Sequence, residues 1–194
     1  MRLINHALNA HVRLLDGQWQ GTIVASDGNV YFGGGSHNLE LGAALFRYEP
    51  KSGKVAILKE NITTACGEDP RKTPPQGKIH SPVVEHDGWI YFGTHPANYT
   101  EQGRKAYPGA HLVGYQLSTG RFRDYGEIAD LAGRRPMWAG DRVTDGRGMV
   151  YMVGRWEVPE TDMRTIGVLR HGTRMAVFFS VMDVRDDLQR ITKR

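Results

Sequence analysis

The stretch DGNVYFG at residues 27–33 recurs as DGWIYFG at residues 87–93 and, with an insertion, as DGRGMVYMVG at residues 145–154. The three aspartates lie 60 and then 58 positions apart. In each copy Asp-Gly favours a tight turn between antiparallel strands, because glycine adopts positive φ without a steric penalty. Aromatic and β-branched residues follow, and they favour a strand. Each copy therefore predicts a β-hairpin, and the spacing predicts an internal repeat.

A second hairpin is predicted after the first in two of the copies. Residues 44–58 (ALFRYEPKSGKVAIL) and residues 111–125 (HLVGYQLSTGRFRDY) each contain two strand-like runs. In both, a glycine follows the strand-ending tyrosine by five positions, a spacing that suits a turn closed by a bulge glycine. Four antiparallel strands per unit and a period of about 60 residues predict an all-β fold made of β-propeller blades.

The repeat predicts a single domain of about three blades, at approximately residues 19–60, 79–127 and 138–181. Residues 10–15 lie where the last strand of a preceding blade would run. Closed propellers typically use about four to eight blades, so three blades predict an incomplete ring. Because an open arc would expose strand edges, we expect the missing blades to come from a longer chain or from self-association.

Residues 27–34 (DGNVYFGG), followed by residues 45–50 (LFRYEP), resemble a Kelch-type blade, in which a strand ends in a double glycine and a Tyr-Asp-Pro-like turn comes later. The second copy departs from this pattern, with Gly93, Thr94 and His95 where the double glycine belongs. The chain is also similar to the bacterial propellers that include oligogalacturonate lyases, streptogramin lyases and quinoprotein-like repeats. The resemblance implies a propeller fold and, for the polyuronate-cleaving members, a face with a metal ion and a histidine base.

The composition limits the classes of partner. The net charge is +4, but basic and acidic residues are interleaved, so the signal for nucleic-acid binding is weak and a solvated surface is favoured. No run approaches the roughly 20 apolar residues of a membrane span, and the first residues lack the apolar run of a signal peptide. The single cysteine, Cys66, allows no internal disulfide and is interpreted as a loop thiol. We expect a soluble protein, and the compartment stays open.

The predicted strand order places the candidate site. The loop entering the first strand of a unit and the loop between its second and third strands share one face, whereas the tight hairpin turns share the other. Long loops on a rigid scaffold commonly bear function. On that face of the second unit lie His80, His95 and His111. His37 occupies a position close to that of His95 in the first unit, and the third unit has Arg155 and Trp156 there.

Histidines that converge on one face of a propeller can bind a divalent ion or supply a general base. We predict His80, His95 and His111 as ligands of Mn²⁺, Zn²⁺ or Ca²⁺, and His80, His95 and Arg155 as catalytic residues. Arg155 can pair with a substrate carboxylate. The predicted substrate contacts are His37, Tyr99, Tyr107 and Trp156. The alternatives are histidines that cap strand ends and tyrosines that anchor their loop.

Two functions are compatible with this pattern. The first is a propeller that binds a small-molecule or carbohydrate ligand, or a protein partner, without chemistry. The second is a lyase or hydrolase that acts on an acidic carbohydrate or a lactone. The sequence contains no P-loop, dinucleotide fingerprint, nucleophile elbow, HExxH motif or cysteine cluster, so those classes of active site are excluded.

Overall fold

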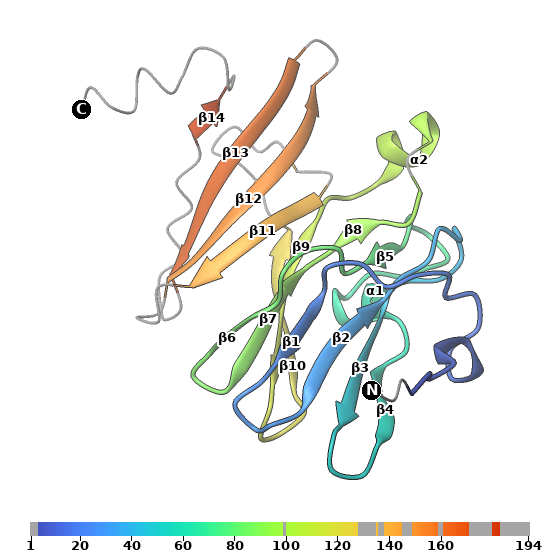
Figure 1. Ribbon diagram of the computed structural model, residues 1–194. Coiled ribbons are helices and arrows are strands. Elements are labelled where there is room, and N and C mark those ends of the chain that lie inside the picture. The colour runs from blue at the N-terminus through green and yellow to red at the C-terminus, as the bar shows by residue number, and fades with distance from the viewer. Residues whose placement is uncertain are drawn as a thin grey trace.

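The computed structural model describes residues 4–98, 100–127, 135, 138–144, 149–158, 161–170 and 180–182, and from residue 138 onward it describes the backbone only. The described chain is mainly β, with antiparallel sheets and little helix, as the sequence predicts (Figure 1). None of the described sheets is closed. No helix in the described part is long and apolar enough to cross a membrane.

The first sheet contains the first repeat, and its strands pair in chain order. They are β1 (Thr22–Val24), β2 (Val30–Gly34), β3 (Ala44–Glu49) and β4 (Lys54–Lys59). The turn between β1 and β2 has the predicted chemistry, because Gly28 adopts a φ of +79°. Asp27 closes this turn by accepting hydrogen bonds from the backbone nitrogen of Asn29 at 3.0 Å and from the Tyr31 hydroxyl at 2.7 Å.

Two further four-stranded antiparallel sheets follow along the chain. The second sheet contains β6 (Val84–His86), β7 (Trp89–Gly93), β9 (His111–Gln116) and β10 (Phe122–Glu127). The third contains β11 (Trp138–Thr144), β12 (Met149–Val158), β13 (Thr161–Arg170) and β14 (Ser180–Met182). The first two sheets confirm that two consecutive hairpins build each of these units.

Among the described residues, a short two-stranded sheet and three small helices interrupt this pattern. The helices are η1 (Leu8–Ala10), α1 (Ile62–Ala65) and α2 (Glu101–Ala106). The small sheet pairs β5 (Gln76–Lys78) with β8 (His95–Pro96), and Lys78 lies opposite His95. It joins the segments before and after the β6–β7 hairpin. Figure 1 shows β5, β8 and α2 at the end of the molecule opposite the β1–β2, β3–β4 and β6–β7 turns.

Residues 10–15 do not form the strand that the sequence suggested. Helix η1 ends at Ala10, turn residues follow, and the first strand-like contact is an isolated bridge between Gly17 and Gly35. Val12 is buried in a cluster with Ala44 and Phe46 of β3, so this segment packs by its side chains instead of pairing along a sheet edge.

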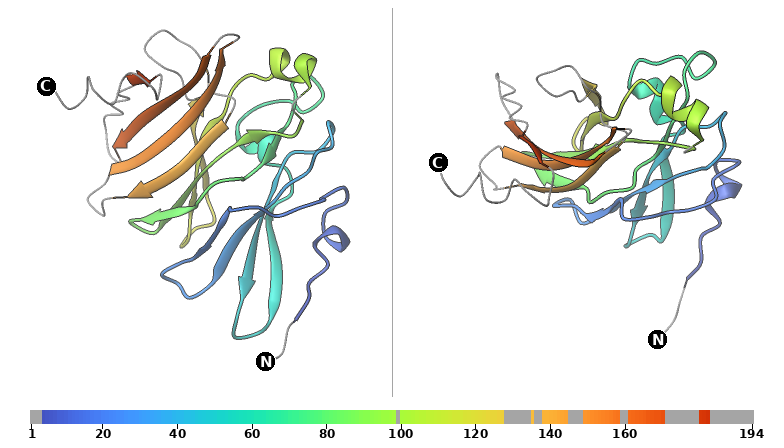
Figure 2. Two further views of the ribbon diagram at one scale, coloured as in Figure 1. Left: turned by 45° about the horizontal axis from the view of Figure 1, so that its top comes forward. Right: turned by 90° about the horizontal axis from the view of Figure 1, so that it is seen from above.

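The main core lies between the first and second sheets, which Figure 2 shows side by side. Residues from both sheets and from the segment that links them form one buried cluster, and its largest members are Tyr31, Leu45, Ile62, Ile79, Ile90, Phe92, Val113 and Tyr115. In the third sheet, β11 lies next to β6 and β7. Ile62 and Ile79 belong to the segment 60–83, so this segment crosses between the first and second sheets with these apolar side chains in the core.

Candidate functional site

Four aromatic side chains form a continuous row at the end of the molecule where β5 and β8 lie. The rings of His37 and Trp19 meet edge to face, with centroids 5.3 Å apart. Trp19 is 5.4 Å from His80, and His80 is 5.5 Å from His95. We call these four residues the aromatic row. It brings together three of the predicted site residues, and it adds Trp19, which the sequence-based prediction of the site did not include.

The aromatic row runs from solvent into the protein. His37 is exposed, Trp19 and His80 are half-buried, and His95 is 3% exposed. Lys78 lies beside the row and is 2% exposed, with its Nζ 5.2 Å from the centroid of the Trp19 ring. An ammonium over an indole face is attracted by the ring quadrupole. The site therefore combines a buried lysine with flat rings that reach the surface.

Burial alters the acid–base properties of this site. It lowers the pKa of the Lys78 ammonium below its ordinary value, against the opposing field of Asp16. Burial first, and the charge of Lys78 second, also lower the pKa of His80 below 6.5. Neutral imidazole consequently predominates at His80 at pH 7, and a neutral imidazole can accept a proton.

Local packing fixes Lys78 and His80 on the same side of their segment. Between them, Ile79 is 1% exposed and packs against Gly33 of β2 and against Gly21, which precedes β1, and at neither glycine is there space for a Cβ. Successive side chains of an extended segment alternate between its faces. Because Ile79 is directed into the core, its two neighbours are directed toward Trp19.

Glycines also allow the indole to approach the backbone. A Cβ at Gly35 would lie 2.6 Å from Cζ3 of Trp19, and a Cβ at Gly17 would lie 2.8 Å from its Cζ2.

At the outer end of the row, His37 Nδ1 lies 3.1 Å from Asp16 Oδ2, and the His37 backbone nitrogen donates to the same oxygen at 3.1 Å. Desolvation opposes ionisation of Asp16, but its bonds to His37 lower its pKa overall.

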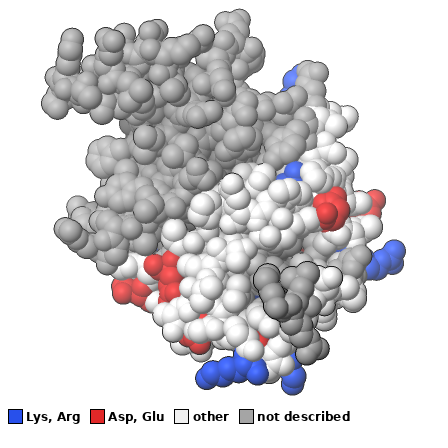
Figure 3. Space-filling model, viewed as in Figure 1, with Lys and Arg blue, Asp and Glu red and all other residues white. Residues whose placement is uncertain are grey.

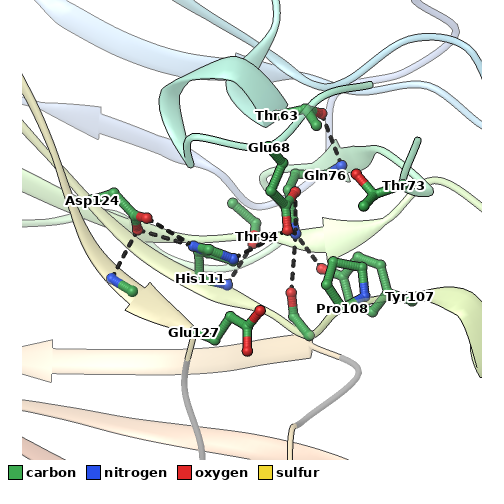
Figure 4. Close-up of polar contacts among 12 residues, drawn as sticks. Thr63, Glu68, Thr73, Gln76, Thr94, Tyr107, Pro108, His111, Asp124 and Glu127 are labelled. Atoms are coloured by element: carbon green, nitrogen blue, oxygen red, sulfur yellow. Dashed lines mark hydrogen bonds and ion pairs between the residues drawn. The ribbon is translucent and has the colours of Figure 1, made fainter. Parts of the chain in front are cut away.

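His111 belongs to a different cluster, which Figure 4 shows in detail. Its Nδ1 lies 3.0 Å and 3.1 Å from the two carboxylate oxygens of Asp124, and its Nε2 lies 3.3 Å from Oε1 of Glu68. Its backbone nitrogen donates to Oγ1 of Thr94 at 2.8 Å. Burial opposes the charging of His111, but Asp124, Cys66 and Glu68 together outweigh it and raise its pKa to about 12.

The described residues contain two groups whose possible metal-ligand atoms all lie within 4.8 Å of one another, and both include His111. One group is Cys66, His111 and Asp124, and the other is Glu68, His111 and Glu127. Neither contains His80 or His95. The three histidines predicted to share one metal ion are thus divided in this structure, with His80 and His95 in the aromatic row and His111 among carboxylates.

The remaining predicted residues fall in three places. Tyr107 is 8% exposed and donates its hydroxyl hydrogen to Oε1 of Gln76, as expected of a residue that anchors its loop. Tyr99 lies outside the described residues. Arg155 and Trp156 lie on β12, of which only the backbone is described, so their predicted roles stay predictions.

The described surface offers no large patch of one charge on the face shown in Figure 3. Lysine, arginine, aspartate and glutamate side chains are scattered around a mostly uncharged area. This distribution agrees with the interleaved charges of the sequence.

Comparisons with known proteins give little further guidance. No family model matches the chain, and no curated protein matches it. Among solved structures, the chain is similar to a puromycin-hydrolyzing peptidase of Mycobacterium tuberculosis, with a TM-score of 0.33 and 18% sequence identity over 74% of this chain. The match covers 18% of that peptidase, so the chain spans less than a fifth of its length. A likeness this weak assigns neither a family nor a function.

Proposed function

We propose that this chain is a ligand-binding part of a β-propeller and that the aromatic row, with Lys78, receives an acidic carbohydrate. The propeller is supported by three four-stranded antiparallel sheets that follow one another along the chain. An arc of such sheets needs further blades to close, so the proposal includes blades from a longer chain or from other copies.

The observation that supports the ligand class is the position of Lys78 beneath Trp19. Aromatic rings stack on the apolar face of a sugar, and an ammonium attracts its carboxylate. Here the Lys78 Nζ lies 5.2 Å from the indole centroid, and the half-buried Trp19 and His80 extend the row toward solvent. Because the local dielectric is low at a buried position, a protonated lysine there attracts an anion more strongly than a surface lysine does.

The experiment measures binding of galacturonate oligomers, with the corresponding neutral galactose oligomers as the comparison ligand, by isothermal titration calorimetry. We expect the acidic ligand to bind and Lys78→Met to weaken it at least about tenfold, since a charge-assisted contact is lost. Lys59→Met is the matched control, because Lys59 also faces an aromatic ring, that of Phe122 at 6.0 Å, but lies on β4. Equal affinity of the two variants, or preference for the neutral sugar, would refute the proposal.

The lowered pKa of His80 favours a second candidate, a lyase. A neutral imidazole can remove the proton next to a sugar carboxylate, and Lys78 can stabilise the negative charge that develops there. The glycosidic C–O bond β to the carboxylate then breaks, and the leaving oxygen takes up a proton from water. The new C=C double bond of the product is detected by its ultraviolet absorbance. We expect His80→Gln to abolish product formation while binding persists. Binding without any product in the unmodified protein would leave the binding function alone.

A further inference from the structure

A bulge in β10 directs two carboxylates of one strand toward the same imidazole. Asp124 pairs with Val113 and Glu127 pairs with His111, with a register shift between the two pairs. Within the bulge, Gly126 adopts a φ of +90°, and its nitrogen donates to Oδ1 of Asp124 at 2.9 Å. In a regular strand two residues three positions apart would face opposite sides, so the bulge is what brings both carboxylates to His111.

The two ring nitrogens of His111 have different surroundings. Nδ1 is within hydrogen-bond distance of both oxygens of Asp124, at 3.0 Å and 3.1 Å. Nε2 is buried and has no hydrogen bond, although Oε1 of Glu68 lies only 3.3 Å away. A carboxylate that holds one nitrogen of a histidine orients the other nitrogen, which is the usual arrangement around a metal-binding histidine.

The segment after α1 contributes a third carboxylate. The Glu68 side chain is 11% exposed, and the Gln76 amide donates to it at 3.1 Å and 3.3 Å (Figure 4). The Arg135 Nε holds Oε2 of Glu127 at 2.7 Å. Both glutamates are thus held in place by neighbours that are not themselves possible ligands.

From this geometry we propose a zinc site whose ligands are Nε2 of His111 and the carboxylates of Glu68 and Glu127, with Asp124 as the partner that orients His111. The three ligand atoms lie within 4.8 Å of one another. Nitrogen and oxygen ligands about 2.0–2.2 Å from a tetrahedral zinc are about 3.4 Å apart, close to the 3.3 Å between His111 Nε2 and Glu68 Oε1. Three protein ligands leave a fourth position open for water or a ligand.

Zinc suits this set better than calcium or magnesium does. Calcium takes six to eight oxygen ligands and magnesium takes six, whereas imidazole nitrogen with two carboxylates is a set that binds zinc. Cys66 belongs to the other group, with His111 and Asp124, and it is not a ligand in the proposed site. The site is separate from the aromatic row and does not depend on the carbohydrate proposal.

The test measures zinc stoichiometry and affinity by competition with a chromophoric chelator, on the full chain after treatment with EDTA. We expect about one zinc per chain and a melting temperature raised by about 5–10 °C at saturating zinc. Glu68→Gln and Glu127→Gln are expected to lose binding at least tenfold, and Asp124→Asn to lose it about 10–100-fold, as partners of metal ligands do. Glu60→Gln removes an exposed carboxylate on the same segment and is expected to bind as the unmodified protein does.

Glu127→Gln keeps the test decisive if the more buried variants fail to fold, because the Glu127 side chain is 31% exposed and circular dichroism can verify its fold. A folded Glu127→Gln protein that binds zinc with unchanged affinity would overturn the proposal, as would less than about 0.1 zinc per unmodified chain. Cobalt substitution tests the ligand set, since a sulfur-to-cobalt charge-transfer band would mean that Cys66 binds the ion and would refute the assigned ligands.

Discussion

Gly33→Ala introduces one methyl group at the point where the first sheet supports the candidate site. Gly33 lies on β2, and its nitrogen donates to the carbonyl oxygen of Gly21 at 2.8 Å. The two glycines together form the surface on which Ile79 packs. Since Ile79 stands between Lys78 and His80, any displacement of Ile79 also displaces these two site residues.

The structure gives the size of the steric conflict. A Cβ at Gly33 would lie 2.5 Å from Cβ of Ile79 and 3.1 Å from its Cγ2 and Cδ1, against 3.4–4 Å for ordinary contact. Because the closest atom is bonded to the backbone, a rotamer change cannot relieve the conflict, and the Ile79 backbone must move by about 1 Å. Overpacking of this kind costs about 1–3 kcal/mol, and we expect the upper end.

Thermal and urea unfolding measure the effect. A loss of about 3 kcal/mol lowers the melting temperature by about 6–12 °C in a chain of this size. Gly28→Asn is the control, because a Cβ at Gly28 meets nothing within 4 Å and asparagine tolerates the φ of +79° found there. We expect the control to change stability by less than about 1 kcal/mol. If Gly33→Ala is as stable as the control and binds the acidic ligand equally well, Ile79 does not position the site.

Four further predictions concern single side chains. Burial raises the pKa of the Cys66 thiol, so we expect it to react with a thiol reagent far more slowly in the folded protein than in urea; equal rates would contradict its burial. Lys78→Met is expected to raise the pKa of His80 toward 6.5, measured by NMR titration of the imidazole, while burial keeps it below that value. In the unmodified protein the folded pKa of His80 lies below the unfolded one, so stability falls as the pH drops below 6.5, and His80→Gln is expected to reduce this loss. Tyr107→Phe leaves the Gln76 acceptor without its donor and is expected to cost about 1–3 kcal/mol in denaturant unfolding, whereas a cost near zero would show that the bond contributes nothing.

The hairpins could be predicted from the sequence because their signals are local. Asp27 and Gly28 determine a turn within a few residues, and the glycines of the second hairpins, Gly53 and Gly120, adopt the positive φ that their spacing predicts. The meeting of His80 and His95 could also be anticipated, since strand order places the loops that contain them on one face. Both predictions follow from the direction in which successive strands run and from the residue types in the turns.

The rest of the site depends on contacts between sheets, which no local pattern encodes. Lys78 resembles a surface lysine in the sequence, but it is buried where β5 pairs with β8 and its Nζ lies over the Trp19 ring. His111 was grouped with the other histidines by its place in the chain, but the bulge that ends at Glu127 gives it carboxylate partners instead. A glycine two residues after Asp124, in a strand-like run, is the one signal of that bulge in the sequence.

The buried charges around His111 also bear on how the protein unfolds. Repeat proteins can lose one unit at a time, because each unit contacts only its neighbours. Here Glu68 follows the first sheet, whereas His111 and Asp124 belong to the second, so separating the sheets would break the contact between Glu68 and His111 and expose the core that the two sheets share. The first two sheets are therefore expected to open together, so that amide hydrogen exchange in β3 and β9 reports one shared free energy of opening.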